Sequence, residues 1–333
     1  MHTFEFIRPK DSAAAVAVAA GAKTAQQGAD IRFVAGGTTL LDLMKLNVET
    51  PGRLVDVNRL PLDKIEATGD GGLSIGATVR NSDLAHHPRV QRDYPVLSQA
   101  ILAGASAQLR NMATTGGNLL QRTRCMYFRD TAMPCNKREP GSGCPAITGS
   151  NRSLAILGTS ENCIATNPSD MCVAMAALEA TIHVQGSKGS RAVPFGEFHL
   201  LPGNTPQRET VLEPGDLITH VTLPPPVAAS KQVYLKLRDR ASYEFALASA
   251  AVVITLAGGN VTRARIALGG VGTKPWRSPE AEAALVGQAA NQANFRKAAE
   301  AALRDAKPQS DNGFKIELAK RCLTHALQMA ATA

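Results

Sequence analysis

Three observations in the sequence predict a protein of two domains. Its fold class is expected to be α+β, with helices and sheets arranged in α/β layers. Its 333 residues exceed the length of one average domain. Short apolar runs alternate with helical segments as far as residue 223, where three consecutive prolines exclude the interior of a helix or sheet. Beyond them, strand-like runs come first and helical segments follow, which is typical of a small antiparallel sheet with helices on one face. We therefore expect a larger domain over residues 1–224 and a smaller one over residues 231–333.

Composition indicates a folded protein and argues against two kinds of partner. Apolar residues make up 44% and charged residues 19%, enough apolar content for a sizeable core. The formal net charge is +8, but the basic residues are spread out, aromatic residues are only 4%, and no nucleic-acid reading element is evident. We therefore expect no nucleic acid; a basic surface that docks on an acidic partner subunit fits the charge. No run approaches the roughly 20 apolar residues that span a bilayer, and the N-terminus does not resemble a signal peptide.

In the larger domain, the expected elements follow the hydrophobic pattern. Strands are expected at residues 3–7, 31–35, 53–57, 73–76 and 181–185, with regular structure also at 155–157. Helices are expected at residues 12–21, from about 38, at 82–85, at 96–106 and at 169–179. Asp11 or Ser12 is the expected cap of the first helix. Between residues 122 and 150 the periodicity disappears and Cys, Pro, Gly and Arg dominate, which indicates an irregular insertion.

In the smaller domain, three strands precede three helices. The strands are expected at residues 233–238, 248–256 and 263–268, and the last two form a hairpin across residues 258–260. The helices are expected at residues 279–286, 294–305 and 313–329.

Two glycine-rich loops suit the binding of phosphate. Gly36-Gly37-Thr38-Thr39 lies between an apolar strand and a helix, so it offers backbone N–H groups, and its glycines let an anion approach closely. The segment Thr114-Thr115-Gly116-Gly117-Asn118 adds hydroxyl groups, two glycines and an amide. Neither loop carries the G-x-G-x-x-G or G-x-x-x-x-G-K-[ST] motif. Two such loops would clamp a pyrophosphate from both sides; the alternative is a pair of ordinary turns.

Four cysteines are candidates for a metal site. Cys125, Cys135 and Cys144 lie in the irregular insertion, separated by nine and eight residues, and Cys163 follows after eighteen more. An iron–sulfur cluster needs thiolates that converge from flexible backbone. Nearby cations would offset the negative charge of such a cluster; they are Arg122, Arg124, Arg129, Lys137 and Arg138.

Three other interpretations of these cysteines remain open. Structural zinc sites usually pair cysteines two to four residues apart, a spacing absent here. Disulfides require an oxidising compartment, and free buried thiols are the third alternative. Cys172 and Cys322 fall on helices and are expected to be core residues. No Ser–His–Asp set, HExxH motif or paired carboxylates stand out, which favours chemistry carried by a cofactor.

Several motifs, in order and spacing, resemble the FAD-binding subunit of the xanthine dehydrogenase (molybdenum hydroxylase) family. They are VAGGTTLLDLMK, IGATVRNSDLA, LRNMATTGGNLLQRTRC, TNPSDMCVAMAALEA and YLKLRDRASYEFALASAAVV. The resemblance runs from about Phe4 to the C-terminal helix. The insertion, RTRCMYFRDTAMPCNKREPGSGCPA followed by ENCIATNPSD, most resembles the branch formed by the flavin subunits of periplasmic aldehyde oxidoreductases, which carry an extra 4Fe–4S cluster.

The resemblance implies a fold and a set of FAD-binding residues. The fold is an FAD-binding domain of the vanillyl-alcohol-oxidase (PCMH) type over residues 1–224, with subdomains at about 1–58 and 59–224 and the iron–sulfur insertion at about 122–165. A CO-dehydrogenase-flavoprotein-like C-terminal domain follows at 231–333. The residues of the first pyrophosphate loop would be Ala35, Gly36, Gly37, Thr38, Thr39 and Leu40, and those of the second Thr114, Thr115, Gly117 and Asn118. Asp170 would bind the sugar or ribityl hydroxyls, and Lys236 would lie beside the flavin ring.

The resemblance also implies a cluster, partners and a compartment. Cys125, Cys135, Cys144 and Cys163 would ligate the 4Fe–4S cluster, although related benzoyl-CoA-type reductases carry a similar cluster in a different segment. The chain would be the electron-transfer subunit of an oxidoreductase, a heterotrimer with a molybdenum-cofactor large subunit and a 2Fe–2S small subunit. Electrons would pass to an external acceptor such as a ferredoxin. The substrate chemistry would take place on the large subunit, so no catalytic residue is expected here.

Alternatives of function and location follow from the same sequence. The complex would be an aldehyde oxidoreductase, with a xanthine dehydrogenase or hydroxybenzoyl-CoA reductase type as the alternative. A zinc- or disulfide-stapled binding module and a stand-alone flavin oxidase are the other classes. The expected compartment is the periplasm, reached by co-export with a partner that bears a twin-arginine signal; the alternative is the cytoplasm.

Overall fold

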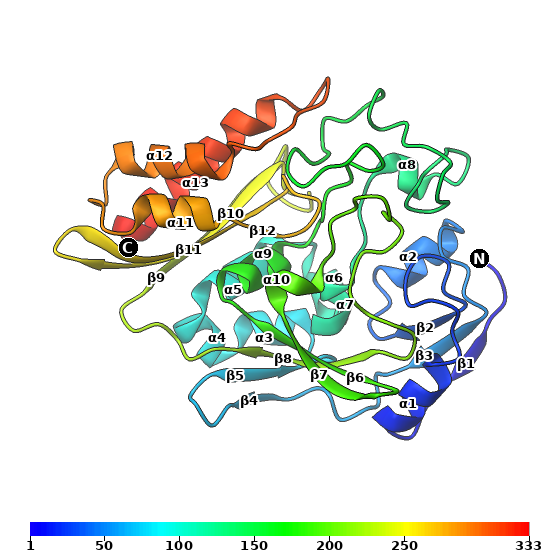
Figure 1. The fold of residues 1–333 in the computed structure, drawn as a ribbon. Helices are drawn as coiled ribbons and strands as arrows, with labels where there is room; N and C mark the ends of the chain where they lie inside the picture. Colours follow the sequence, from blue (N-terminus) through cyan, green and yellow to red (C-terminus); the bar gives the residue numbers. More distant parts are fainter. Residues whose placement is uncertain (333) are drawn as a thin grey trace.

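The computed structural model describes residues 1–332 and arranges their strands in three sheets (Figure 1). The first is a parallel sheet of order β1-β3-β2, formed by β1 (Glu5–Ile7), β2 (Ile31–Val34) and β3 (Arg53–Asp56). Parallel neighbours need crossover connections, and here these contain α1 (Ser12–Ala19) and α2 (Leu40–Lys45). The carboxylate of Asp11 caps α1 by accepting from Ala14 N at 2.7 Å, as expected.

The second sheet is antiparallel and has the order β4-β5-β8-β6-β7. Its strands are β4 (Ile65–Ala67), β5 (Leu73–Gly76), β6 (Thr181–Gly186), β7 (Gly189–Pro194) and β8 (Leu217–Leu223). The helices of this part are α3 (Asn81–His86), α4 (Pro88–Asp93), α5 (Pro95–Ala103), α6 (Ala107–Met112), α7 (Thr115–Leu119), α9 (Asp170–Ala177) and α10 (Phe195–Phe198). The main hydrophobic core lies between this sheet and the buried faces of α5 and α9.

The third sheet belongs to the C-terminal part and has the order β12-β11-β10-β9. Its strands are β9 (Lys231–Leu237), β10 (Ala248–Ala257), β11 (Asn260–Gly269) and β12 (Trp276–Arg277). The expected hairpin is present: β10 and β11 pair across Gly258 and Gly259, which both have positive φ. The helices α11 (Pro279–Leu285), α12 (Gln292–Ala302) and α13 (Phe314–Thr332) cover one face, as Figure 1 shows. The sheet also packs against α5 and α9 of the preceding part, and the expected α+β fold is confirmed.

The segment from residue 120 to residue 168 is largely irregular, which includes the predicted range 122–150, and contains the short helix α8 (Met126–Arg129). Regular structure at residues 155–157 was a wrong expectation. Instead, the backbone N–H groups of Ile156 and Leu157 both donate to the carbonyl of Val271, at 2.8 and 2.9 Å. The end of the insertion is therefore attached to the C-terminal sheet. Among residues 1–332, no helix is long and apolar enough to cross a membrane.

Candidate functional site

The two glycine loops line one pocket. It encloses about 1250 Å³, a volume that includes the part open to solvent. The predicted residues that line it are Ala35, Gly36, Gly37, Thr38, Thr39, Leu40, Thr114 and Gly117. The structure thus brings together, on the walls of one pocket, two segments that are almost 80 residues apart in the sequence.

Gly36 sets the distance between the two loops. A Cβ atom at this position would lie 1.9 Å from the carbonyl oxygen of Met112 and 3.2 Å from the Cα of Ala113. Both contacts are with backbone immediately before the second loop, so no side-chain rotation relieves them. Arg80 strengthens the junction, since its guanidinium donates to the carbonyl of Met112 and to Asn58. Only glycine fits here without separating the loops.

The first loop has hydrogen-bond donors without protein partners. Within residues 1–332, the backbone N–H groups of Gly36, Gly37, Thr38 and Thr39 donate to no protein acceptor, and the Thr39 side chain makes no cap to α2. Gly37 has a φ of 72°, a conformation that favours glycine. Adjacent unpaired N–H groups that line a pocket fit an anionic group such as a pyrophosphate.

The second loop contributes shape more than donors. Its N–H groups are used internally, because Thr115 donates to Val79, Gly116 to Ala77 and Gly117 to the Thr114 hydroxyl. Gly116, which belongs to the predicted loop but not to the set of residues implied by the resemblance, lines the pocket with Gly117. Without a Cβ atom on either residue, the backbone of this loop approaches the pocket closely.

Two predicted residues of the second loop point elsewhere. The hydroxyl of Thr115 donates to the carbonyl of Val79 at 3.2 Å in the buried interior. The side-chain oxygen of Asn118 accepts from Ser169 at 2.6 Å and from Gln121 at 2.6 Å. Asn118 therefore connects the second loop to the start of α9, one residue before Asp170.

Asp170 and Lys236 form a buried ion pair. The two groups lie 2.8 Å apart, and their side chains are only 8% and 3% exposed. The hydroxyl of Tyr234 donates to the other carboxylate oxygen of Asp170 at 2.5 Å, and Lys236 also donates to the carbonyl of Ala103 at 3.1 Å. Burial, followed by the charge of Asp170, raises the pKa of Tyr234 well above its ordinary value.

This ion pair lies away from the glycine pocket. Asp170 lines a separate hollow that Cys125 and Phe245 also line. The structure brings Asp170 and Lys236 into contact, and the hydrogen bond of Asn118 to Ser169 connects the second loop to the residue before Asp170. Sequence reasoning missed Tyr234, which lies two residues before Lys236 on the same face of β9; this period-two spacing was the available signal.

The four candidate cysteines surround one small cavity. Cys125, Cys135, Cys144 and Cys163 all line it, and all four are free thiols. In the part of the chain that the structure describes, no group of three or more His, Cys, Asp or Glu side chains is arranged to hold a metal ion. The four thiols nevertheless line the same cavity from an irregular segment, and ligands of iron–sulfur clusters commonly come from such segments.

Cys125, Cys144 and Cys163 are in an apolar setting that resists ionisation. Burial raises the pKa of Cys125 to about 11 and also raises that of Cys144. Burial also raises the pKa of Cys163, although the nearby Lys137 ammonium acts in the opposite direction. Thiolates here therefore need a positive partner such as a metal centre.

The cations of the insertion have different partners. Arg124 and Arg129 both pair with Asp42 on α2, at 3.1 and 2.9 Å, and Arg138 donates to backbone carbonyls of the insertion. Of the five cations expected to offset a cluster, Lys137 is the one whose charge acts on the Cys163 thiol.

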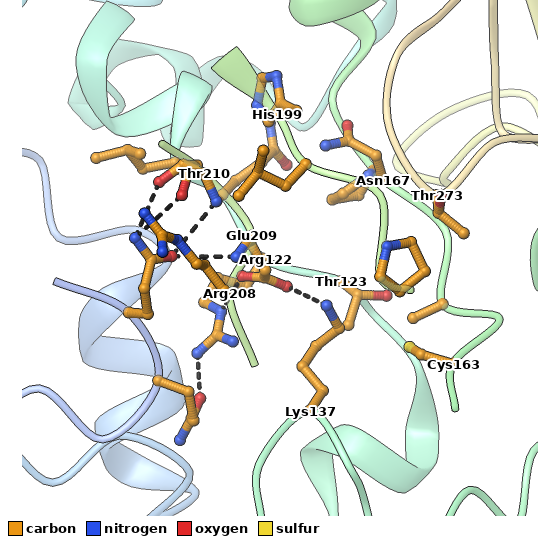
Figure 2. A pocket seen from close by; sticks show the side chains of 18 of the residues that line it. Arg122, Thr123, Lys137, Cys163, Asn167, His199, Arg208, Glu209, Thr210 and Thr273 are labelled. Carbon is orange, nitrogen blue, oxygen red and sulfur yellow. Dashed lines mark hydrogen bonds and ion pairs between the residues drawn. The ribbon is translucent and has the colours of Figure 1, made fainter. Parts of the chain in front are cut away.

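A chain of ionic groups lies between the glycine pocket and the cysteine cavity. Figure 2 shows Arg122 and Lys137 reaching Glu209 from different segments, beside Cys163. Glu209 accepts from Arg122 Nε at 2.6 Å and from Lys137 Nζ at 2.7 Å. Burial alone would raise the pKa of Glu209, but these two cations outweigh it and lower the pKa to about 2.

The chain of ionic groups continues to the glycine pocket. Arg122 also pairs with Glu49, and Glu49 pairs with Arg32 at 3.0 Å. Arg122, Arg32 and Glu49 line the glycine pocket, whereas Lys137 lines the cysteine cavity. Sequence reasoning named Arg122 and Lys137 as cations but did not find either glutamate.

Two family profiles cover almost the whole chain. Residues 2–226 match the FAD-binding domain in molybdopterin dehydrogenase, and residues 233–330 match the CO dehydrogenase flavoprotein C-terminal domain. Together they define an FAD-binding subunit of an oxidoreductase. The chain belongs to the FAD-binding (medium) subunits of the molybdenum hydroxylase family, which confirms the resemblance found in the sequence and FAD as the cofactor.

Individual relatives agree with this assignment. The chain is 55% identical to the aldehyde oxidoreductase FAD-binding subunit PaoB of Escherichia coli (strain K12), over 94% of this chain and 95% of the relative. It is 29% identical to the glyceraldehyde dehydrogenase medium chain of Sulfolobus acidocaldarius, over 84% and 82% of the two chains. Among solved structures, reconstituted CO dehydrogenase from Oligotropha carboxidovorans superposes with a TM-score of 0.78 at 26% identity, over 99% of this chain and 98% of that one.

Proposed function

We propose that this chain is the electron-transfer subunit of a heterotrimeric, molybdenum-dependent aldehyde oxidoreductase and that it carries a 4Fe–4S cluster besides FAD. The observation that carries the proposal is the convergence of Cys125, Cys135, Cys144 and Cys163 on one cavity, next to the FAD-binding loops. The 55% identity to a subunit named for aldehyde oxidoreductase supports the substrate class.

The overall reaction fixes what this subunit must do. Oxidation of an aldehyde, with water as the source of the added oxygen atom, gives the carboxylic acid and releases two electrons and two protons. The aldehyde would react on the molybdenum-cofactor subunit, and the 2Fe–2S subunit would relay the two electrons to this chain. An external acceptor of the ferredoxin type would then take them one at a time. Docking of an acidic acceptor is consistent with the net charge of +8.

The residues of the chain would divide the binding of FAD between them. We infer that the free N–H groups of Gly36, Gly37, Thr38 and Thr39 hold the pyrophosphate. Thr114 and Gly117 would close the other side of the glycine pocket. When bound, FAD supplies two-electron redox chemistry that the side chains of this chain lack.

Asp170 and Lys236 are proposed to act at the other end of the cofactor. The Asp170 carboxylate would accept from sugar or ribityl hydroxyls, and the Lys236 ammonium would favour a reduced, anionic flavin. Their contact at 2.8 Å supports a joint role, because the position of each charge depends on the other. The domain limits at residues 224 and 231 remain a prediction.

The proposed compartment is the periplasm. The chain would reach it in a folded complex with a signal-bearing partner, and cytoplasmic location is the alternative. Fractionation of cells that express all three subunits tests this point: enrichment of this chain in the periplasmic fraction supports co-export, and its retention in the cytoplasm contradicts it.

Analysis of the purified complex tests the proposed function. We expect co-purification with two partner subunits, one FAD per complex, and more iron than two 2Fe–2S clusters contain. Cys144→Ser should lose only the excess iron, whereas Cys172→Ala, which alters a fully buried core thiol outside the cavity, should keep it. A complex without FAD would contradict the proposed FAD site, and one without excess iron would contradict the proposed cluster. A complex that is inactive towards aldehydes would contradict the proposed substrate class.

A further inference from the structure

The ionic chain between the two cofactor sites alternates in sign. Starting at the cysteine cavity, it passes from Lys137 to Glu209, then to Arg122, to Glu49 and to Arg32. Glu49, Lys137 and Arg122 are only 2%, 7% and 8% exposed. Charges so deeply buried are tolerated when each has opposite neighbours, and removal of one leaves the others uncompensated.

Glu209 lies between Lys137 and Arg122 in this ionic chain and is held firmly. Its side chain is 26% exposed, and its backbone N–H donates to the side-chain oxygen of Gln26 at 3.1 Å. Gln26 in turn donates to the carbonyl of Leu212 at 2.7 Å. The carboxylate therefore has a defined position from which it binds Lys137, which lines the cysteine cavity, and Arg122, which lines the glycine pocket.

Arg122 extends the connection to the apolar core of the insertion. Its guanidinium lies 4.6 Å from the ring centroid of Phe128. Phe128 packs in the same apolar cluster as Cys125, Cys135 and Cys163. One Arg122 nitrogen, Nη2, is buried without a protein partner, and Arg122 lines the glycine pocket.

A second connection reaches the first glycine loop directly. Leu43, on α2, belongs to the apolar cluster that contains the cysteines. Its neighbour Asp42 accepts from Arg124 and Arg129 of the insertion. Helix α2 begins at Leu40, immediately after the loop, so the insertion is attached to the helix that follows the first glycine loop.

We propose that Glu209 is a positioning residue that couples the two cofactor sites, so that FAD retention depends on the cysteine insertion and cluster retention depends on the FAD pocket. It acts through Lys137 on the cysteine side and through Arg122 on the FAD side. This inference rests on the proposed 4Fe–4S cluster. Neither the family profiles nor the resemblance assigns Glu209 a role.

The test uses the purified three-subunit complex and the variant Glu209→Gln, which keeps shape and removes charge. FAD dissociation is followed by flavin fluorescence, and the cluster by iron content and low-temperature EPR. We expect FAD affinity and iron retention each to fall about 10- to 100-fold, the range typical of lost outer-shell partners, and the EPR line shape to change. Lys137→Met should act alike, and Lys137→Arg should restore the wild-type spectrum.

The control is Glu317→Gln. Glu317 makes a comparable two-bond pair with Arg296, at 3.0 Å for each bond, on the exposed C-terminal helices. The FAD affinity and the iron content of the Glu317→Gln complex should equal those of the wild-type complex. The inference is overturned if Glu209→Gln matches this control, or if only one of the two cofactors is affected. A wild-type complex without cluster iron would instead overturn the proposed function, which separates the two failures.

Discussion

A single methyl group at Gly36 should separate the two FAD-binding loops. In Gly36→Ala, the added Cβ would lie 1.9 Å from the Met112 oxygen and 2.7 Å from the Met112 carbonyl carbon. Both atoms are backbone, and they belong to the segment that leads into the second loop. The collision can be relieved only by moving one loop away from the other.

The size of the effect follows from the geometry. An ordinary van der Waals contact begins at 3.4 Å, so the loops must part by about 1.5 Å, the difference between 3.4 and 1.9. Overpacking of this kind typically costs about 1–3 kcal/mol. Because about 1.4 kcal/mol corresponds to a factor of ten, FAD affinity should fall roughly 10- to 100-fold.

Flavin content of the purified complex and FAD titration of the deflavinated complex measure this loss. Gly69→Ala is the matched control, since a Cβ at Gly69 meets no atom within 4 Å and this glycine has no positive φ. The reasoning is refuted if Gly36→Ala binds FAD as tightly as Gly69→Ala does.

Three further predictions concern buried charges. Lys236→Met should lower the midpoint potential of the bound flavin by an amount on the order of 30 mV, about 1.4 kcal/mol for a two-electron couple, because the variant lacks the ammonium that is paired with Asp170 and proposed to favour the reduced, anionic flavin. Spectroelectrochemistry that finds an unchanged or higher potential contradicts the proposed role. Lys315 is fully buried and donates to three backbone carbonyls, so Lys315→Met should destabilise the C-terminal part by about 3 kcal/mol. Hydrogen exchange in α13 should be faster in this variant than in the control Lys297→Met, which changes an exposed lysine. Equal exchange rates would count against a stabilising role of Lys315. Glu209 has a pKa of about 2 against an ordinary value of 4.5, so the stability that its carboxylate contributes is complete above about pH 4.5 and is lost as the pH falls towards 2. Between pH 5 and pH 3 the melting temperature of the wild-type protein should therefore fall more steeply than that of Glu209→Gln. Parallel curves would show that this carboxylate does not contribute to stability.

Local patterns in the sequence were enough to find most elements and the outline of the site. The strand before Gly36, the cap of α1 and the C-terminal hairpin all depend on residues close in sequence, and each was predicted within a few positions. The same holds for the irregular cysteine insertion, because loss of periodicity is visible without tertiary contacts.

Strands β8 and β7 were missed for different reasons. Strand β8 pairs with β5 and β6, over 140 and about 35 residues away, and its Thr and His residues interrupt the apolar run. Strand β7 is an edge strand that is almost entirely exposed, so it has no apolar face to detect.

The coupling residues could not be found from the sequence for a related reason. Glu209 meets Arg122 across 87 residues and Glu49 meets Arg122 across 73. A single glutamate on a loop carries no local signal of such a partner. The roles of Asp170 and Lys236 came from the family resemblance, and the structure adds that these residues contact each other.

Low-temperature EPR of the reduced complex tests the central claim most directly, that this one chain carries an iron–sulfur cluster beside its FAD site. We predict a 4Fe–4S signal in addition to those of the two 2Fe–2S clusters of the partner. In Cys144→Ser this signal should disappear while the 2Fe–2S signals remain. A wild-type spectrum that contains only 2Fe–2S signals, or a Cys144→Ser spectrum identical to wild type, would contradict the account.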